Sequence, residues 1–147
     1  MTARDRFEAV VAAGSYMTIA TAGIDGDPWV SPVWFASADG REFLWMSRPG
    51  ARHSQNIADR PRIAIAIFDS GQPPGTGAGA YVAADAALVP DGELEDAVAT
   101  FSRISQAKGA GSFARSDVDG DAPHRMYRAV ARERYVLSSG DERSPVD

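Results

Sequence analysis

With 147 residues, 44% of them hydrophobic and 24% charged, the chain has the size and balance of one globular domain, which excludes a largely disordered protein. Its formal net charge of -5 argues against nonspecific nucleic-acid binding, which depends on a basic surface that releases counterions. The lack of cysteine excludes disulfides, thiolate metal sites and cysteine nucleophiles.

The N-terminal residues Met1–Glu8 are charged and lack the apolar stretch of a signal peptide. No apolar run approaches the roughly 18–20 residues that cross a bilayer. We therefore expect a cytoplasmic protein with no membrane and no nucleic-acid partner. Residues 1–147 are expected to form one domain, with an N-terminal helix within residues 1–14 and a polar tail at residues 139–147.

The first predicted element is an amphipathic helix over Arg4–Ala13, in which Phe7, Val10 and Val11 share one face. Gly14 follows as its C-cap. Two further helices are predicted from helical spacing and flanking turn residues. They cover Ala51–Asp59 and Asp91 to about Gln106.

Six segments rich in β-branched and aromatic residues are predicted as strands. They are Tyr16–Thr21, Trp29–Phe35, Phe43–Ser47, Arg62–Phe68, Ala80–Val89 and Tyr127–Leu137. Turn residues at Gly23–Pro28 and at Asp39–Gly40 join the first three strands, which we expect to pair as an antiparallel meander. The absence of strand–helix alternation then predicts a mainly β, antiparallel barrel. The remaining segments, Ser70–Gly79, Gly109–Ala122 and Ser138 onward, are predicted loops.

Two local features of the first strands bear on a binding site. Pro32 cannot donate to a β-ladder, so the second strand should lie at a sheet edge or carry a bulge. Trp29 and Trp34 are five residues apart and should point to opposite faces of that strand. We expect one of them in the core and the other exposed to a cleft or a partner subunit.

The segment Met46–Asn56 concentrates hydrogen-bond donors at a strand-to-helix turn. Arg48 and Arg52 flank a Pro-Gly turn, and imidazole, hydroxyl and amide side chains follow where the helix begins. A helix N-terminus has free backbone N–H groups and a partial positive charge, so it attracts anions. The spacing predicts a phosphate site, and a solvated basic turn is the alternative.

Other kinds of site have weaker support in the sequence. Asp117–Ala122 is similar to a calcium loop, but Arg128 stands where its final glutamate would be. No Gly-x-Ser-x-Gly motif is present, and His53 and His124 are the only histidines. The alternating glycines of Ser70–Gly79 lack the lysine of a phosphate-binding loop. We expect no metal site.

The order of these segments resembles the pyridoxamine 5′-phosphate oxidase-like family. The resemblance rests on Trp29–Phe35, Leu44–Ser47 and Arg52–Ala64, extends over Tyr16–Phe68, and returns faintly at His124–Leu137. It implies the FMN-binding fold of that family, a six-stranded antiparallel split β-barrel with a few short helices. It also implies a homodimer with two cofactor sites at the subunit interface.

The resemblance further implies which residues bind the cofactor. In this family the second strand lines the isoalloxazine ring, the end of the third strand contacts the cofactor, and a basic pair at the helix start holds the FMN phosphate. The residues so implied, with neighbouring donors, are Trp29, Val30, Ser31, Pro32, Val33, Met46, Ser47, Arg48, Arg52, His53, Ser54, Gln55 and Asn56. No catalytic side chain is expected, because the cofactor supplies the chemistry.

Three departures from the family pattern narrow the expected function. His53 stands where lysine is frequent, so the charge at that place depends on pH. Tyr81 lies where many members carry a glutamine that contacts the ring. The chain stops soon after its last strand, without the substrate-binding segment of true oxidases, so we do not expect it to oxidise pyridoxamine phosphate.

We therefore expect an FMN-dependent oxidoreductase that transfers hydride to or from a small substrate. Three alternatives stay open. The cofactor could be a deazaflavin (coenzyme factor 420), the barrel could store or sense a flavin without catalysis, or it could be a dimeric interaction module without a cofactor.

Overall fold

The computed structural model describes residues 1–138 and 140–147. Its helices in this part of the chain are α1 (Ala3–Ala13), α2 (Arg52–Asp59) and α3 (Leu94–Ala107), with 3₁₀ turns η1 (Asp91–Glu93) and η2 (Arg115–Asp117). The strands are β1 (Tyr16–Ala22), β2 (Pro28–Trp34), β3 (Glu42–Ser47), β4 (Arg62–Phe68), β5 (Gly79–Leu88), β6 (Arg125–Ser138) and β7 (Glu142–Pro145). The predicted mainly β fold with short helices is confirmed.

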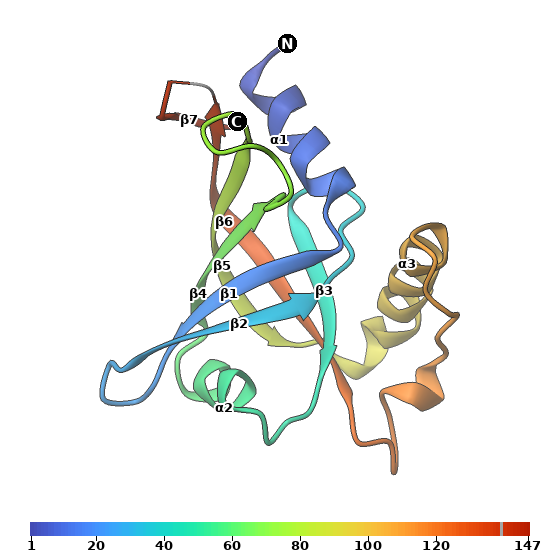
Figure 1. The fold of residues 1–147 in the computed structure, drawn as a ribbon. Helices are drawn as coiled ribbons and strands as arrows, with labels where there is room; N and C mark the ends of the chain where they lie inside the picture. Colours follow the sequence, from blue (N-terminus) through green and yellow to red (C-terminus); the bar gives the residue numbers. More distant parts are fainter. Residues whose placement is uncertain (139) are drawn as a thin grey trace.

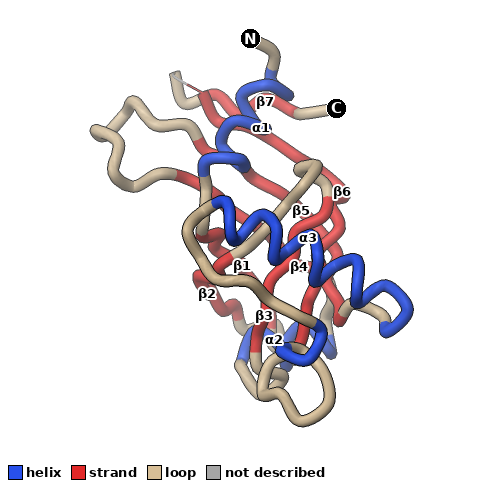
Figure 2. The backbone as a smooth tube through the Cα atoms, turned by 90° about the vertical axis from the view of Figure 1, so that its right-hand side faces the viewer, coloured by secondary structure: helices blue, strands red, loops and turns tan. Residues whose placement is uncertain are grey.

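The strands form one antiparallel sheet that curls into a barrel. Their order is β2-β1-β4-β5-β6-β3, and β7 pairs with β6. The two ends of this path meet where Ala36, just beyond β2, bridges to Leu44 of β3. Helix α2 lies beneath one end of the barrel, α1 lies at the other, and α3 packs on the outside (Figures 1 and 2).

Two apolar clusters stabilise this arrangement. The larger fills the barrel, where alternating residues of the strands point inward, among them Met17, Ile19 and Trp45. The second lies between α3 and the outer side of β3 and β6, where Leu44 and Phe101 are buried. Both faces of β3 are therefore covered, which fits its nearly continuous burial.

The predicted three-strand meander is correct for its first hairpin and wrong for its second. β1 pairs with β2 along its whole length, but β3 pairs with β6, and its link to β2 is the single Ala36–Leu44 bridge. The physical reason is the closure of the barrel. β3 finds its partner far along the chain, where Trp45 stacks on Tyr127 with ring centroids 5.8 Å apart.

The predictions for α1 and for the second strand are confirmed with added detail. Thr2 and Asp5 cap the start of α1 reciprocally, and Gly14 caps its end. Gly14 has an ordinary extended backbone, but a Cβ there would lie 2.9 Å from Ile67 Cγ2, so close packing excludes a side chain. Pro32 is exposed on β2, which lies at one end of the strand order, as an edge strand should.

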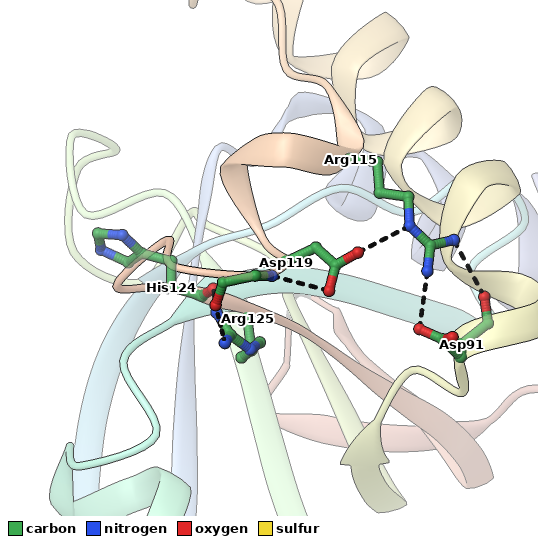
Figure 3. A network of polar contacts seen from close by, with 6 residues as sticks. Asp91, Arg115, Asp119, His124 and Arg125 are labelled. Atoms are coloured by element: carbon green, nitrogen blue, oxygen red, sulfur yellow. Dashed lines mark hydrogen bonds and ion pairs between the residues drawn. The ribbon is translucent and has the colours of Figure 1, made fainter.

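Ion pairs order part of the segment that we predicted as the loop Gly109–Ala122. Arg115 of η2 donates to Asp91 of η1 at 2.7 Å and to Asp119 at 2.9 Å (Figure 3). Arg125 donates to the backbone carbonyls of Gly120, Ala122 and His124. The ring of His124 points away from these ion pairs (Figure 3). Among the described residues, no group of three or more His, Asp or Glu side chains is placed to hold a metal ion.

The C-terminal segment differs from the predicted polar tail. Glu142–Pro145 forms β7 against β6, and the guanidinium of Arg143 lies over the rings of Tyr81 and Tyr135. Ser139, the first residue of the predicted tail, lies outside the described residues. In the part of the chain that the structure describes, no helix has both the length and the apolar character to cross a membrane.

Candidate functional site

The start of α2 is a helix end without a side-chain cap. Ala51 occupies the N-cap position and makes no capping hydrogen bond. The first backbone bond of the helix runs from the Gln55 N–H to the Ala51 carbonyl at 3.0 Å, so the N–H groups of residues 52–54 precede any helical acceptor. A polar residue such as Ser or Asp usually occupies this place. Because alanine occupies the N-cap position here, the backbone N–H groups of residues 52–54 remain available to another acceptor.

Ser47 and His53 meet across the turn that joins β3 to α2. Ser47 Oγ lies 2.7 Å from His53 Nε2, which makes a short hydrogen bond between a buried hydroxyl and a half-buried imidazole. Burial lowers the pKa of His53 below its usual value near 6.5, because the charged form is less well solvated there. The imidazole is therefore mainly neutral at pH 7.

Ser54 adds an unused polar group to the first turn of α2. Its side chain is only 3% exposed, and its hydroxyl has no hydrogen-bond partner among the described residues. Buried hydroxyls normally find a partner, since leaving one unpaired costs roughly 1–3 kcal/mol. An unpaired hydroxyl beside free N–H groups is the kind of donor that an anion would use.

Arg52 and Trp29 form the exposed wall of this region. The guanidinium carbon of Arg52 lies 4.2 Å from the centroid of the Trp29 ring, which is a cation–π contact. Trp29 is 40% exposed, whereas Trp34 packs on Phe101 of α3 at 5.2 Å. The two tryptophans therefore lie on opposite faces of β2, as predicted, with Trp29 exposed beside α2.

The charge of Arg52 also affects Asp25, in the hairpin between β1 and β2. The backbone N–H of Asp27 donates to Asp25, and this hydrogen bond, with the charge of Arg52, holds the pKa of the Asp25 carboxyl below its usual value. Arg60, at the end of α2, donates to the Ile24 carbonyl. Helix α2 is thus tied to the hairpin that carries Trp29.

Asn56 makes the buried part of this connection. Its Nδ2 donates to Thr21 Oγ1 at 3.0 Å, and both side chains are buried. Our sequence reasoning assigned Asn56 to the cofactor and did not assign Thr21 a role. The signal for Thr21 was present, because a hydroxyl at an inward position of β1, in step with Met17 and Ile19, needs a partner.

Replacement of Asn56 by alanine should destabilise the fold by about 1–3 kcal/mol, since the buried Thr21 hydroxyl would lose the donor from which it accepts and keep only its long hydrogen bond to the Trp29 carbonyl. We expect Asn56→Leu combined with Thr21→Val to cost less than the sum of the two single changes. Urea unfolding of the wild type, Asn56→Leu, Thr21→Val and the double variant measures this. If the losses of stability in the two single variants add up to that of the double variant, the hydrogen bond between Asn56 and Thr21 does not contribute to stability.

The structure brings some of the predicted site residues together and separates others. Those around the start of α2 are Trp29, Ser47, Arg52, His53 and Ser54. Side chains alternate between the two faces of β2, so Val30 and Pro32 lie on the outer surface and Ser31 and Val33 point toward the interior. Met46 packs toward α3, on the opposite side of β3 from Ser47. Arg48 and Gln55 are exposed.

Two of the molecule's cavities lie near the loop between β4 and β5, away from this site. Cavities of about 650 Å³ and 560 Å³ flank the loop between β4 and β5, at the end of the barrel away from α2. None of the predicted site residues lines either of them. At the start of α2, Arg52 and Trp29 are instead exposed on the surface.

Comparison with known proteins agrees with this architecture. A family model described as pyridoxamine 5′-phosphate oxidase matches residues 3–137. None of the curated proteins matches the chain. Among solved structures, a heme-binding protein from Mycobacterium smegmatis has a TM-score of 0.81 at 21% identity, and the match covers 99% of this chain and 58% of that one.

Two further solved structures match over nearly their whole length. A FAD-binding protein from Mesorhizobium loti has a TM-score of 0.69 at 21% identity, with 92% of this chain and 94% of that chain covered. The heme storage protein HutZ from Vibrio cholerae has a TM-score of 0.71 at 17% identity, with 96% and 97% covered. Such identities show a shared fold only. Because the family model spans residues 3–137, the chain belongs to the pyridoxamine 5′-phosphate oxidase family and has its FMN-binding split-barrel fold.

Proposed function

We propose that this protein is a flavin-dependent oxidoreductase that holds the phosphate of FMN at the start of α2. The observation that carries the proposal is the uncapped helix end at Ala51, which leaves backbone donors free beside Arg52. Backbone N–H groups, a helix dipole and a guanidinium are the groups that bind phosphate in proteins.

Polar side chains around the helix end also suit a phosphate in kind. Ser47 and His53 lie at one side of the helix end, and the buried Ser54 hydroxyl still lacks a partner there. A phosphate oxygen would accept from such donors and supply the missing partner. Arg52 adds a charged fork that suits a phosphate better than a point charge would.

The cofactor, when bound, supplies hydride transfer, and the chain supplies binding and orientation. Arg52 neutralises the phosphate, the donors at the start of α2 fix its position, and the indole of Trp29 offers a flat apolar surface beside it. The hydrogen bond between Asn56 and Thr21 keeps α2 in register with the hairpin that carries Trp29.

A homodimer is part of the proposal, because the outer face of β2, β1 and β4 is mainly apolar where a solvated face would be polar. Its exposed apolar residues include Tyr16, Val30, Pro32, Ala64 and Phe68, and Arg62 is an exposed charged residue of the same face. Val30, which is 59% exposed, neighbours Trp29 in the chain. A second copy covering this face would bury these exposed apolar side chains.

The visible spectrum of the purified protein tests the proposal. We expect FMN to bind with bands near ~450 nm, and a protein of twice the monomer mass by light scattering. A band near ~420 nm would instead identify the deazaflavin, and a sharp band near ~400 nm would identify haem, which two of the structural relatives bind by their descriptions. Failure to bind any of these would refute the proposed function.

Binding of FMN should strengthen as the pH falls from about 8.5 toward 6.5. The ligand-free imidazole of His53 is mainly neutral because burial lowers its pKa, and a neighbouring phosphate favours the protonated form, so binding takes up a proton. The affinity then changes by up to about tenfold per pH unit. Titration at several pH values measures this, and His53→Asn should remove the dependence.

The stability of the ligand-free protein should change with pH in the opposite direction. The unfolded chain takes up a proton on His53 below about pH 6.5, before the folded protein does, so stability falls as the pH drops through that range.

Riboflavin, which has no phosphate, is the control ligand for the pH dependence of FMN binding. An equal pH dependence for riboflavin would contradict the role of His53 at the phosphate.

A further inference from the structure

Helix α1 and strand β7 lie together at the end of the barrel away from α2 (Figures 1 and 2). Phe7 of α1 is fully buried there, and Val146, just beyond β7, packs against the same apolar core. Val146 also donates its backbone N–H to the carbonyl of Arg134 on β6 at 2.9 Å. The chain beyond β7 is therefore held beside Arg134.

Arg134 is the one charged residue that is buried among the residues that the structure describes. It is only 6% exposed, and it pairs with Val82, whose side chain lies in the barrel core. Its guanidinium carbon lies 5.4 Å from the centroid of the Phe7 ring, which is a cation–π contact. A Cβ on Gly40 would lie 3.9 Å from Arg134 Nη1, so the turn before β3 covers the guanidinium from another side.

The buried charge of Arg134 has no carboxylate partner. Among the described residues, no Asp or Glu side chain lies within ion-pair distance of it. The pKa of Arg134 is lowered, first by burial and then by the charges of Arg41 and Arg4. Glu8 and Asp39 act in the opposite direction but have smaller effects. Buried arginines are almost always paired, because an uncompensated charge in the interior is costly.

Arg134 and Arg4 share one hydrogen-bond acceptor. Nη2 of Arg134 donates to the main-chain carbonyl oxygen of Asp147 at 2.5 Å, and Nη2 of Arg4 donates to the same oxygen at 2.6 Å. The two guanidiniums come from different elements, β6 and α1, and they meet at this oxygen. A guanidinium suits a carboxylate, which accepts through two oxygens and supplies the compensating charge.

We propose that Arg4 and Arg134 form a carboxylate-binding site at this end of the barrel, with the carbonyl oxygen of Asp147 in the place of one carboxylate oxygen. Either of two sources can supply the carboxylate: the main-chain end of residue 147, in a protein that ends there, or a separate molecule that displaces this residue. Only Asp147 would have to move, since Val146 keeps its own contacts with β6 and the core. The inference does not depend on the proposed function.

Titration with succinate, and with the uncharged succinamide as the matched control, tests the site in two forms of the protein. One form ends at Asp147, and the other carries Gly-Ser-Gly after it. The backbone N–H groups of Gly40 and Val146 lie beside Arg134, so their NMR shifts report binding.

The two forms distinguish the two sources of the carboxylate. If the end of the chain is the ligand, the extension should lower the midpoint of urea unfolding, and succinate should bind the extended form about tenfold more tightly, since the competing carboxylate is removed. If a separate molecule is the ligand, the two forms should unfold alike and bind succinate with equal affinity.

Arg4→Gln should weaken succinate binding about tenfold and remove any effect of the extension on stability, because one of the two guanidiniums is lost. Arg134→Met should act in the same way. Arg4 is exposed, so its variant decides the outcome even where the change at the buried Arg134 prevents folding. Arg103→Gln, at an exposed arginine of α3, is the control and should bind succinate as the wild type does.

Four outcomes would overturn the proposal: binding of succinamide as tightly as succinate, wild-type behaviour in Arg4→Gln, no effect of either succinate or the extension, or loss of succinate binding in Arg52→Ala. The last of these would place the bound succinate at the start of α2. Succinate binding that depends on Arg4 in a protein that binds no FMN would support this site and refute the flavin site alone.

Discussion

Arg52→Ala should weaken FMN binding by about tenfold to a hundredfold, the largest loss that we expect from one exposed side chain. Arg52 stands at the uncapped start of α2, where its guanidinium lies over Trp29. A hydrogen bond to a charged group contributes about 1.5–3 kcal/mol, and the helix end alone would then hold the phosphate. Equilibrium titration, followed by quenching of flavin fluorescence, measures the change.

Matched ligands and variants isolate the phosphate contact. Riboflavin should bind Arg52→Ala and the wild type with similar affinity, because it lacks the phosphate that we propose Arg52 neutralises. Arg52→Lys keeps the positive charge but lacks the planar guanidinium. Its affinity for FMN should therefore lie between those of the wild type and Arg52→Ala. Arg103→Ala removes an exposed arginine of α3 and should leave binding unchanged. Equal loss of riboflavin and FMN affinity would place Arg52 at the ring instead.

The sequence predicts the individual strands well, because their signal is local. The alternation of Arg62–Phe68 reproduces the bounds of β4, and the predicted Tyr16–Thr21 falls one residue short of β1. Each such strand has one face in the barrel and one outside, so hydrophobic side chains recur at every second position. The turn residues at Gly23–Pro28 likewise fix the first hairpin without help from the rest of the chain.

The partner of β3 could not be predicted in this way. β3 pairs with β6, so Trp45 faces Tyr127, about eighty residues further along the chain. Both faces of β3 are covered, by the barrel interior and by α3, and this burial removes the alternation that marks a half-exposed strand. The short turn at Asp39–Gly40 suggested that β3 pairs with β2. In the structure β3 pairs with β6 instead, because closure of the barrel brings these two strands together.

The position of the candidate site in the fold could be predicted from the sequence, but the burial of its side chains could not. Residues 46–56 identify the junction of β3 and α2, and Arg52 and His53 lie there. Strand alternation alone could have separated Met46 from Ser47, which face opposite sides of β3. Nothing in the local sequence shows that Ser54 is buried without a partner, since that follows from how α2 packs.

Trp45→Ala should destabilise the protein by about 3–5 kcal/mol, the largest loss of stability that we expect from one change. Trp45 is fully buried in the barrel, and its ring stacks on Tyr127 at an interplanar angle of 17°. Such a loss is a large part of the roughly 5–15 kcal/mol that stabilises a typical domain. Urea unfolding at a fixed protein concentration measures it, and Trp29→Ala, at the exposed tryptophan, is the control.

The indole nitrogen of Trp45 makes phenylalanine the informative second variant. Nε1 of Trp45 is buried and has no partner among the described residues, so Trp45→Phe removes an unpaired donor while it keeps an aromatic ring against Tyr127. The stability lost should therefore be well below that of Trp45→Ala. Trp45 and Ser47 point to the same side of β3. Phenylalanine should thus keep Ser47 beside His53 and leave FMN affinity unchanged, whereas alanine, by loosening β3, should weaken it.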